Sequence, residues 1–324
     1  MSFGSERMVS LNSDFEVVIA GGGISGLTAA TVSARLGRKT LLLIGDMLGG
    51  NLVSIEKIEG YPGFPDGIPG YDLCPLVQAQ AAEAGAEFDM TMLDTLAPLP
   101  QGWVVSGGEQ EYAARAVILA TGTTMKELGV PGELDLVGRG VSHCASCDAP
   151  LLRDRAVAVV GGGDSALQEA LTLAEFASKV IILQQGGDLS AQATFRNRVA
   201  AHPRIEINTH VSVLEILGDD AVSGLRYRNT VNGKTGDLEV VGVFLYIGLS
   251  PNTKYLFGQM DLDFGGGIPT DSKMRTGLAG VFAAGTVRSN SLGRAVASAG
   301  DGATAAIAAD KFLSRGIWLN GEMD

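Results

Sequence analysis

The sequence predicts an α/β fold made of two three-layer units. One reason is a recurring order of apolar strand, glycine turn, helix and apolar strand, which starts at Glu16 and again at Ala156. A second reason is the composition, because 46% of the 324 residues are hydrophobic, which excludes a disordered chain. A chain of this length has room for about two domains. Alternating strands and helices predict a parallel sheet with helices packed on it.

The first repeat begins with the apolar run EVVIA at 16–20, which has the length of a buried strand. A helix is expected over 27–36 and a second strand over 39–44. Three glycines with G-x-G-x-x-G spacing stand between strand and helix: Gly21, Gly23 and Gly26. The first allows a tight turn, the second lets a pyrophosphate approach the backbone, and the third lets the helix pack on the strand. Chance produces this motif in a glycine-rich chain, but its place between strand and helix predicts a dinucleotide site.

The second repeat has the same order of elements. A strand over 156–160, a helix over 167–177 and a strand over 179–183 surround a turn with alanine at its third position. The expected residues of this possible second-nucleotide turn are Gly161, Gly163, Asp164, Ser165 and Ala166. Each turn also has a plainer interpretation, namely a glycine turn of an ordinary α/β domain that binds no nucleotide.

The rest of the chain supplies further elements of the same kinds. We expect a helix over 73–84 and a hairpin of two strands, 103–106 and 111–119. A strand is expected over 239–247, followed by a turn over 249–252. The last expected elements are a strand over 281–285 and a long helix over 295–313. The segment VPGE at 130–133 predicts a turn and a candidate hinge.

The charge and the cysteine count exclude several classes of function. The formal net charge is −12, which argues against nucleic acid as a partner. No run of about 18 apolar residues indicates a membrane span, and the first residues lack a signal-peptide pattern. Three cysteines are too few for a secreted disulfide framework. We therefore expect a cytoplasmic protein, in which a close cysteine pair is more often catalytic than structural.

Two of the cysteines, Cys144 and Cys147, are separated by two residues and can form a disulfide. A helix that begins there would stabilise a thiolate through its dipole, and a thiolate attacks a partner disulfide through a mixed disulfide. Asp148 follows directly and could relay a proton, although a carboxylate also fits a helix end. A structural disulfide and half of a zinc site are the alternatives. Zinc needs four ligands, and Cys74 and the three histidines do not have ligand spacing.

Several ordered motifs resemble the low-molecular-weight thioredoxin reductases, a family of FAD-dependent disulfide oxidoreductases. GRGVSHCASCD at 138–148 runs into the second glycine turn, and GGN at 49–51 is followed by IEGYPGF at 58–64. IGLSPNT at 247–253 and AGDG at 299–302 add to the likeness, which covers nearly the whole chain. The residues after the cysteine pair are also similar to the flavoprotein part of alkyl hydroperoxide reductase, without its thioredoxin-like domains.

The resemblance implies two Rossmann-like domains and FAD as cofactor. The FAD domain would be discontinuous, at 1–122 and 247–324, and a pyridine-nucleotide-type domain at 123–246 would carry the cysteine pair. The implied FAD-binding residues lie in the first turn, at strand ends and at the start of the last helix: Gly21, Gly23, Ile24, Ser25, Gly26, Gly45, Gly50, Asn51, Ala120, Thr121, Gly122, Gly285, Thr286, Arg294 and Ala295.

The resemblance also implies a path for electrons. They would pass from nicotinamide to flavin, then to the Cys144–Cys147 disulfide and on to a thioredoxin-like protein. Cys147 would face the flavin, Cys144 would attack the substrate, and Asp148 would move protons. The family works as a homodimer and alternates between two domain orientations, with hinges expected near Val130–Pro131 and Gly248.

The chain departs from the family where NADPH-using members bind the ribose phosphate with a histidine and arginines. Segment 184–191, QQGGDLSA, has no basic residue. Two charge-assisted hydrogen bonds lost at ~1.5–3 kcal/mol each would weaken NADPH binding by about two to four orders of magnitude. The acidic residue that favours NADH is missing too, although Gln184 or Gln185 could substitute weakly. The donor stays open between NAD(P)H, a ferredoxin-type protein and a second flavin.

The flavin end departs as well. Thr286 stands where the family has an aspartate on the ribityl chain, and LGR at 292–294 replaces Tyr-Arg-Gln. A threonine hydroxyl can still hydrogen-bond there, and Arg294 near the pyrimidine edge would stabilise reduced, anionic flavin. Both changes lie where a different donor would be accommodated.

Three side chains and two other functions complete the alternatives. His143 could carry protons or only flank the turn, Cys74 fits a small buried hydrophobe, and Trp318 fits tail packing or stacking on a flavin. A dithiol oxidase that passes electrons to oxygen is a further function, but such relatives commonly have histidine where this chain has Asp148. A non-catalytic flavoprotein would not need an intact Cys-x-x-Cys-Asp.

Overall fold

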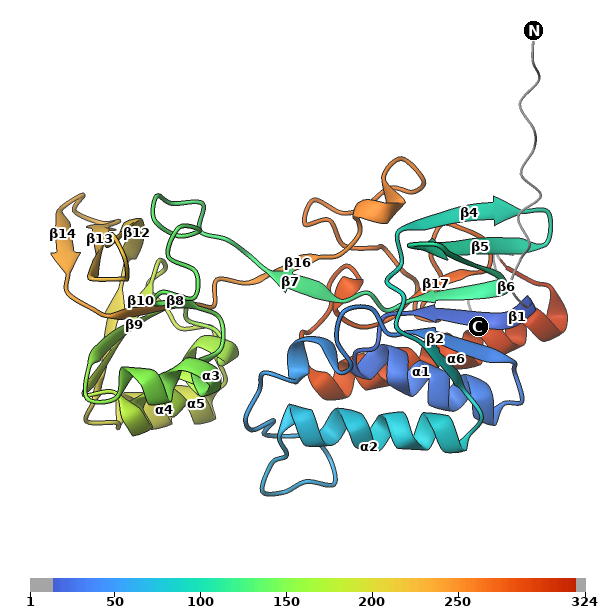
Figure 1. The fold of residues 1–324 in the computed structure, drawn as a ribbon, viewed down its shortest axis with the longest axis horizontal. Coiled ribbons are helices and arrows are strands. Elements are labelled where there is room, and N and C mark those ends of the chain that lie inside the picture. The colour runs from blue at the N-terminus through green and yellow to red at the C-terminus, as the bar shows by residue number, and fades with distance from the viewer. Residues whose placement is uncertain (1–13, 319–324) are drawn as a thin grey trace, which may run out of the picture. The chain divides into compact units, whose positions relative to one another are not determined.

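The computed structural model describes residues 14–318, and the chain divides into two compact units (Figure 1). One unit combines the chain up to Thr124 with the chain from Ser250 onward, and the other runs from Met125 to Leu249. Each unit has its own parallel sheet and apolar core, which confirms the predicted α/β class. Among the described residues, no helix is both long enough and apolar enough to cross a membrane.

The first unit is built on a sheet with strand order β3–β2–β1–β6, and β17 pairs with the end of β6. These five strands, all in parallel pairings, are β1 (Asp14–Ala20), β2 (Thr40–Leu43), β3 (Glu87–Asp89), β6 (Gln110–Leu119) and β17 (Val281–Ala283). Ala20 pairs with Leu43 and Leu119, and Leu119 pairs with Ala283. The carboxyl ends of four strands therefore meet at one edge, where parallel sheets bind ligands.

Helices cover one face of this sheet. In Figure 1, the helices α1 (Ile24–Arg35), α2 (Gly70–Glu83) and α6 (Ala295–Arg315) lie on the same face. The hairpin of β4 (Thr95–Leu99) and β5 (Gly102–Gly107) pairs antiparallel with the first half of β6. The strands contribute apolar side chains to one core under the helices and to a second core on the opposite face. Burial on both faces explains why the first strand is apolar without alternation.

The second unit has a five-stranded sheet of order β11–β10–β9–β15–β8, with parallel pairings throughout. Its strands are β8 (Val141–Ser142), β9 (Ala156–Val160), β10 (Lys179–Gln184), β11 (Ile205–Thr209) and β15 (Gly242–Leu245). One face carries α3 (Ala145–Asp148), α4 (Asp164–Phe176) and α5 (Ala193–Ala200). The other face carries an antiparallel sheet of β12 (Val211–Leu217), β13 (Gly224–Asn229) and β14 (Thr235–Leu238) (Figure 1).

Both glycine-turn helices begin earlier than predicted. The helix α1 begins at Ile24 instead of Leu27, and α4 begins at Asp164 instead of Leu167. Each helix therefore starts directly after the second glycine of its turn, and the third small residue lies inside the helix. The first amides of each helix consequently belong to the turn itself, which is the arrangement that binds phosphate.

The chain crosses between the units at β7 (Thr123–Met125) and β16 (Leu249–Pro251), which pair with each other. The sequence predicted only a turn over 249–252, and this is wrong, because Leu249–Pro251 form a strand. The pairing partner of this strand, β7, lies far away in the chain, so the local sequence does not indicate it. The predicted hinge at Val130–Pro131 lies inside the second unit instead. There the Pro131 carbonyl accepts a hydrogen bond from the Ile216 amide at 2.9 Å.

Candidate active site and cofactor sites

The first glycine turn has the backbone that a bound pyrophosphate requires. Gly21 has a φ of 117°, and a Cβ there would lie 2.2 Å from the Ala120 carbonyl oxygen. A Cβ on Gly26 would lie 1.8 Å from the Gly21 carbonyl oxygen, whereas one on Gly23 would meet nothing within 4 Å. Packing within the protein therefore requires Gly21 and Gly26, while Gly23 leaves open backbone at the start of α1. This turn fits the pyrophosphate of FAD.

The strand ends bring other expected FAD-binding residues to the same sheet edge. The Ala120 amide donates to the Ala20 carbonyl at 2.7 Å, and the Ala284 amide donates to the Leu119 carbonyl at 2.9 Å. Gly285 then turns close to α1, because a Cβ on it would lie 2.6 Å from Ser25 Oγ. The expected residues in the turns at this edge are Gly21, Gly23, Ile24, Ser25, Gly26, Gly45, Ala120, Thr121, Gly122, Gly285 and Thr286.

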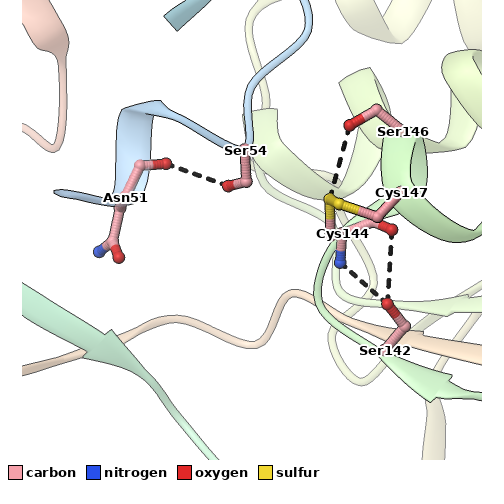
Figure 2. Close-up of a disulfide and its surroundings, with 6 residues drawn as sticks. All are labelled: Asn51, Ser54, Ser142, Cys144, Ser146 and Cys147. Carbon is pink, nitrogen blue, oxygen red and sulfur yellow. Dashed lines mark hydrogen bonds between the residues drawn. A yellow bond between two sulfur atoms is a disulfide. The ribbon is translucent and has the colours of Figure 1, made fainter. Parts of the chain in front are cut away.

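Asn51 and two threonines form a row of polar side chains in the first unit. Asn51 Nδ2 donates to the Thr123 carbonyl at 2.7 Å and to Thr123 Oγ1 at 3.2 Å, and Thr123 Oγ1 lies 3.4 Å from Thr286 Oγ1. The Asn51 carbonyl accepts a hydrogen bond from Ser54 Oγ at 3.2 Å (Figure 2). Gly50 and Asn51 belong to a short 3-10 turn, Gly50–Leu52. The row is neutral, so Thr286 joins a hydroxyl network where the family has a carboxylate.

A carboxylate and an arginine near Gly285 were not predicted as site residues. The Asp301 carboxylate, on α6, accepts a hydrogen bond from the Gly285 amide at 3.1 Å. It also forms an ion pair with Arg288, whose Nη1 lies 2.6 Å away. The AGDG motif at 299–302 was the only signal in the sequence that could have found it. The helix α6 begins at Ala295, and Arg294 is its N-cap residue. Both residues, which the resemblance assigns to FAD binding, therefore lie at the start of this helix.

Cys144 and Cys147 are joined in a disulfide, with 5.4 Å between their Cα atoms. Figure 2 shows the contacts around it: the Cys144 amide donates to Ser142 Oγ at 3.0 Å, and Cys144 Sγ lies 3.5 Å from Ser146 Oγ. Cys144 is the N-cap residue of α3, so a helix does begin at the pair, as expected. This helix has only four residues, and its dipole is correspondingly small.

The residues flanking the pair are fixed by the backbone. His143 Nδ1 lies 3.0 Å from the Leu245 carbonyl oxygen, so the imidazole is held on the end of β15 and flanks the turn. Asp148 is the last residue of α3, and its amide donates to the Cys144 carbonyl at 3.3 Å. Cys147 is exposed and Cys144 is half-buried. The pair is thus presented on a single helical turn with a carboxylate at its end.

The second glycine turn shares the backbone features of the first. Gly161 has a φ of 133°, and a Cβ there would lie 2.2 Å from the Tyr246 carbonyl oxygen. Asp164 is the first residue of α4. Its carboxylate accepts two hydrogen bonds from Gln192, one from the backbone amide at 2.7 Å and one from Nε2 at 2.8 Å. Ser165 and Ala166 follow inside α4, and Ala166 is fully buried. The turn has the shape of a nucleotide turn, and a carboxylate lies at its helix start.

The segment after β10 brings no lysine or arginine to this turn. Gln184 Nε2 donates to the Asp188 carbonyl at 3.1 Å, so the first glutamine is used inside the segment. A Cβ on Gly187 would lie 3.0 Å from the His210 ring, so a larger residue there would have to displace the imidazole. Packing therefore favours glycine at position 187 of the QQGGDLSA segment.

Cys74 and Trp318 both lie in the apolar core of the first unit. Cys74 is fully buried, and burial raises the pKa of its thiol to about 11, which agrees with the interpretation as a small hydrophobe. The Trp318 ring packs edge-on against Phe282 and Phe312, at centroid distances of 5.0 and 5.3 Å. Over residues 14–318, no group of three or more His, Cys, Asp or Glu side chains could hold a metal ion.

Comparisons with known proteins agree with this geometry. The model of the pyridine nucleotide-disulphide oxidoreductase family matches residues 15–302. The chain belongs to this family. It is 38% identical to a thioredoxin reductase of Mycolicibacterium smegmatis, over 92% of this chain and 96% of that one. It also matches the crystal structure of Lactococcus lactis thioredoxin reductase with a TM-score of 0.91 and 33% identity, over 93% of this chain and 99% of that one.

A third likeness is to a ferredoxin-flavin thioredoxin reductase from Clostridium acetobutylicum. The identity is 27% and the TM-score is 0.52, over 94% of this chain and 98% of that one. The motif resemblance found in the sequence is thereby confirmed at the level of the low-molecular-weight thioredoxin reductase family. The chain is a flavin-dependent thiol-disulfide oxidoreductase with FAD as its cofactor.

The bound FAD would supply a pair of electrons, and the protein's residues determine where the electrons go. The Cys144–Cys147 disulfide takes up two electrons and two protons and becomes two thiols. One thiol then loses its proton, attacks a partner disulfide, and is released when the other thiol closes the Cys144–Cys147 bond again. Gly23 and the α1 amides would hold the pyrophosphate, and Asp301 holds the Gly285 turn beside it.

Proposed function

We propose that this protein reduces the disulfide of a thioredoxin-like protein. The observation that supports this proposal best is the Cys144–Cys147 disulfide on a single helical turn that ends in Asp148. The named relatives in M. smegmatis and L. lactis are thioredoxin reductases, and the chain covers nearly all of each. By resemblance, the unit up to Thr124 and from Ser250 is assigned to FAD, and the middle unit to the second nucleotide.

Within this proposal the two cysteines have different roles. Cys144 attacks the partner disulfide, Cys147 exchanges electrons with the flavin, and Asp148 moves the proton that each exchange requires. Replacing one cysteine at a time with serine distinguishes the roles. In Cys147→Ser, Cys144 can attack but nothing resolves the product, so a stable mixed disulfide with thioredoxin is expected. Cys144→Ser should trap much less, and Cys74→Ser, at a fully buried cysteine, is the matched control.

The test is made with FAD-loaded protein, a bacterial thioredoxin as probe and non-reducing mass spectrometry. A mixed disulfide at Cys144 in the Cys147→Ser variant supports both the substrate class and the roles. A mixed disulfide that forms only in the Cys144→Ser variant, at Cys147, would reverse the roles. No adduct with thioredoxin, together with reduction of a small disulfide such as a dinitrobenzoate dimer, would refute the thioredoxin-like substrate.

We propose as a second candidate that the electron donor is not a pyridine nucleotide. Segment 184–191 has no basic side chain to bind a ribose phosphate, and the Asp164 carboxylate stands at the start of α4, bound to Gln192. A negative charge at the helix start opposes a pyrophosphate. The C. acetobutylicum relative is named for ferredoxin and flavin, so a ferredoxin-type protein or a second flavin is the donor class that we favour.

An anaerobic titration decides between the donors. NADPH, NADH, reduced ferredoxin and dithionite are added separately to FAD-loaded protein, and flavin bleaching is followed in the visible spectrum. Bleaching by ferredoxin and dithionite alone supports the second candidate. Rapid bleaching by micromolar NADPH or NADH would refute it and return the donor to NAD(P)H.

The assembly and the location of the protein complete the proposal. We propose a homodimer, as in the family, and a cytoplasmic location, where a dithiol stays reducible. Light scattering of FAD-loaded protein measures the assembly, and a monomer mass at micromolar concentration would refute the dimer.

A further inference from the structure

A largely buried ion pair holds the turn that carries Thr286. The Asp301 and Arg288 side chains are each 16% exposed, and Arg288 Nη1 lies 2.6 Å from Asp301 Oδ2. The same carboxylate oxygen accepts a hydrogen bond from the Gly285 amide at 3.1 Å. Arg288 Nε also donates to Thr270 Oγ1 at 2.8 Å. One carboxylate oxygen therefore fixes the residue before Thr286 and, through Arg288, a second segment of the chain.

The place of Asp301 is set by the packing of α6 on α1. A Cβ on Gly302 would lie 2.1 Å from the Ser25 carbonyl oxygen, so the backbones of the two helices approach closely there. A Cβ on Gly285 would lie 2.6 Å from Ser25 Oγ, so the turn meets the same residue of α1. Ser25 lies in the first turn of α1, directly after the glycines that fit the pyrophosphate. Asp301 therefore ties the turn to the two helices next to the pyrophosphate site.

The backbone on both sides of Thr286 is held in this way. The segment Gly285–Val287 forms a 3-10 turn, and the Arg288 amide donates to the Gly285 carbonyl at 3.2 Å. Within this turn the Thr286 hydroxyl lies 3.4 Å from Thr123 Oγ1. Because the rotamers open to a side chain depend on its backbone, fixing the turn also limits the directions in which the Thr286 hydroxyl can point.

We propose that Asp301 is a positioning residue for FAD binding, and that it acts through the Thr286 hydroxyl. The ribityl chain of FAD carries hydroxyl groups, which suit a hydroxyl partner better than the anionic pyrophosphate does. Ordering a turn at the moment of binding lowers affinity, and a turn that is ordered in advance avoids this loss. The Arg288–Asp301 pair orders the turn before FAD arrives. The inference rests on FAD as the cofactor, and on neither the thioredoxin-like substrate nor the electron donor.

The test is a double-mutant cycle on FAD binding. FAD is titrated into the FAD-free form of each variant, and binding is followed by flavin fluorescence. Thr286→Val removes the hydroxyl and keeps the shape of the side chain, so it should weaken FAD binding about three- to tenfold. Asp301→Asn removes the charge that holds Arg288 and should weaken binding by a similar factor. Because both changes remove the same contact, the double variant should bind FAD within about twofold of Thr286→Val alone.

The matched control is Asp310→Asn on the same helix. Asp310 forms a comparable ion pair with Arg38, at 2.7 Å and with its side chain 26% exposed. This variant should bind FAD within about twofold of the wild type. Urea unfolding of the FAD-free proteins shows whether each variant is folded.

Two results would overturn the proposal. One is an Asp301→Asn variant that binds FAD as tightly as Asp310→Asn does. The other is a double variant whose loss equals the product of the two single losses, since Asp301 would then act independently of Thr286. Should Asp301→Asn not fold, Arg288→Gln takes its place in the cycle, with the same two outcomes. Failure to trap thioredoxin in the cysteine variants would refute the proposed substrate and leave these FAD dissociation constants unchanged.

Discussion

Alanine substitutions at Gly23 and Gly26 separate what the first turn does for FAD from what it does for the fold. A Cβ on Gly26 would lie 1.8 Å from the Gly21 carbonyl oxygen, and real Cβ atoms do not approach closer than 3.0 Å. The helix α1 would have to shift by roughly 1.2 Å against β1. Overpacking of this kind costs about 1–3 kcal/mol or more of folding free energy. Gly26→Ala should therefore unfold at a clearly lower urea concentration.

Gly23→Ala has a different expected result. Gly23 has a φ of −73°, and a Cβ there meets nothing within 4 Å, so the free energy of unfolding of the FAD-free protein should change by less than about 0.5 kcal/mol. The new methyl occupies the space through which a phosphate reaches the α1 amides. Losing one charge-assisted hydrogen bond at ~1.5–3 kcal/mol would weaken FAD by about one to two orders of magnitude.

The assay combines urea unfolding of FAD-free protein with an FAD titration followed by flavin fluorescence. Gly163→Ala in the second turn is the matched control, because its Cβ would lie 3.8 Å from Ser190 Oγ, an ordinary contact. It should leave FAD affinity unchanged. A Gly23→Ala variant that binds FAD as tightly as the wild type would refute the placement of the pyrophosphate at this turn.

Two further predictions concern the core of the first unit. Phe282 is fully buried and packs against the Phe312 and Trp318 rings. Phe282→Ala should therefore cost about 3–5 kcal/mol in urea unfolding, while Phe264→Ala, at an exposed side chain, should cost less than about 0.5 kcal/mol. Burial raises the pKa of the Cys74 thiol to about 11, so Cys74 stays protonated below that pH; iodoacetamide at neutral pH should label the reduced pair in native protein and Cys74 only after unfolding. Labelling of native Cys74 would contradict its burial.

Local sequence predicted the elements whose signals are local. The strand β9 has the predicted bounds, because its five apolar residues stand between Arg155 and the glycine turn that begins at Gly161. The helix starts were predicted three residues late, because apolar periodicity begins only after the turn whereas the backbone hydrogen bonds begin inside it. The strand β16 could not be predicted, because its pairing partner β7 lies over a hundred residues away and no residue near 250 indicates it.

The site shows the same limit. The glycines and the cysteine pair could be found because their chemistry depends on spacing along the chain. Asp301 could not be assigned, because its carboxylate reaches Gly285 only through the packing of α6.

The two glycine turns show what such a motif can and cannot decide. In both, a following loop binds the carbonyl of the middle glycine: the Gly49 amide reaches Gly22 at 2.8 Å, and the Ala191 amide reaches Gly162 at 3.2 Å. The two turns thus share their backbone, which by itself does not select a ligand. They differ in the side chains around them, since the second has the Asp164 carboxylate bound to Gln192. A glycine motif therefore predicts the shape of a turn, and the charges next to it decide which phosphate, if any, will bind.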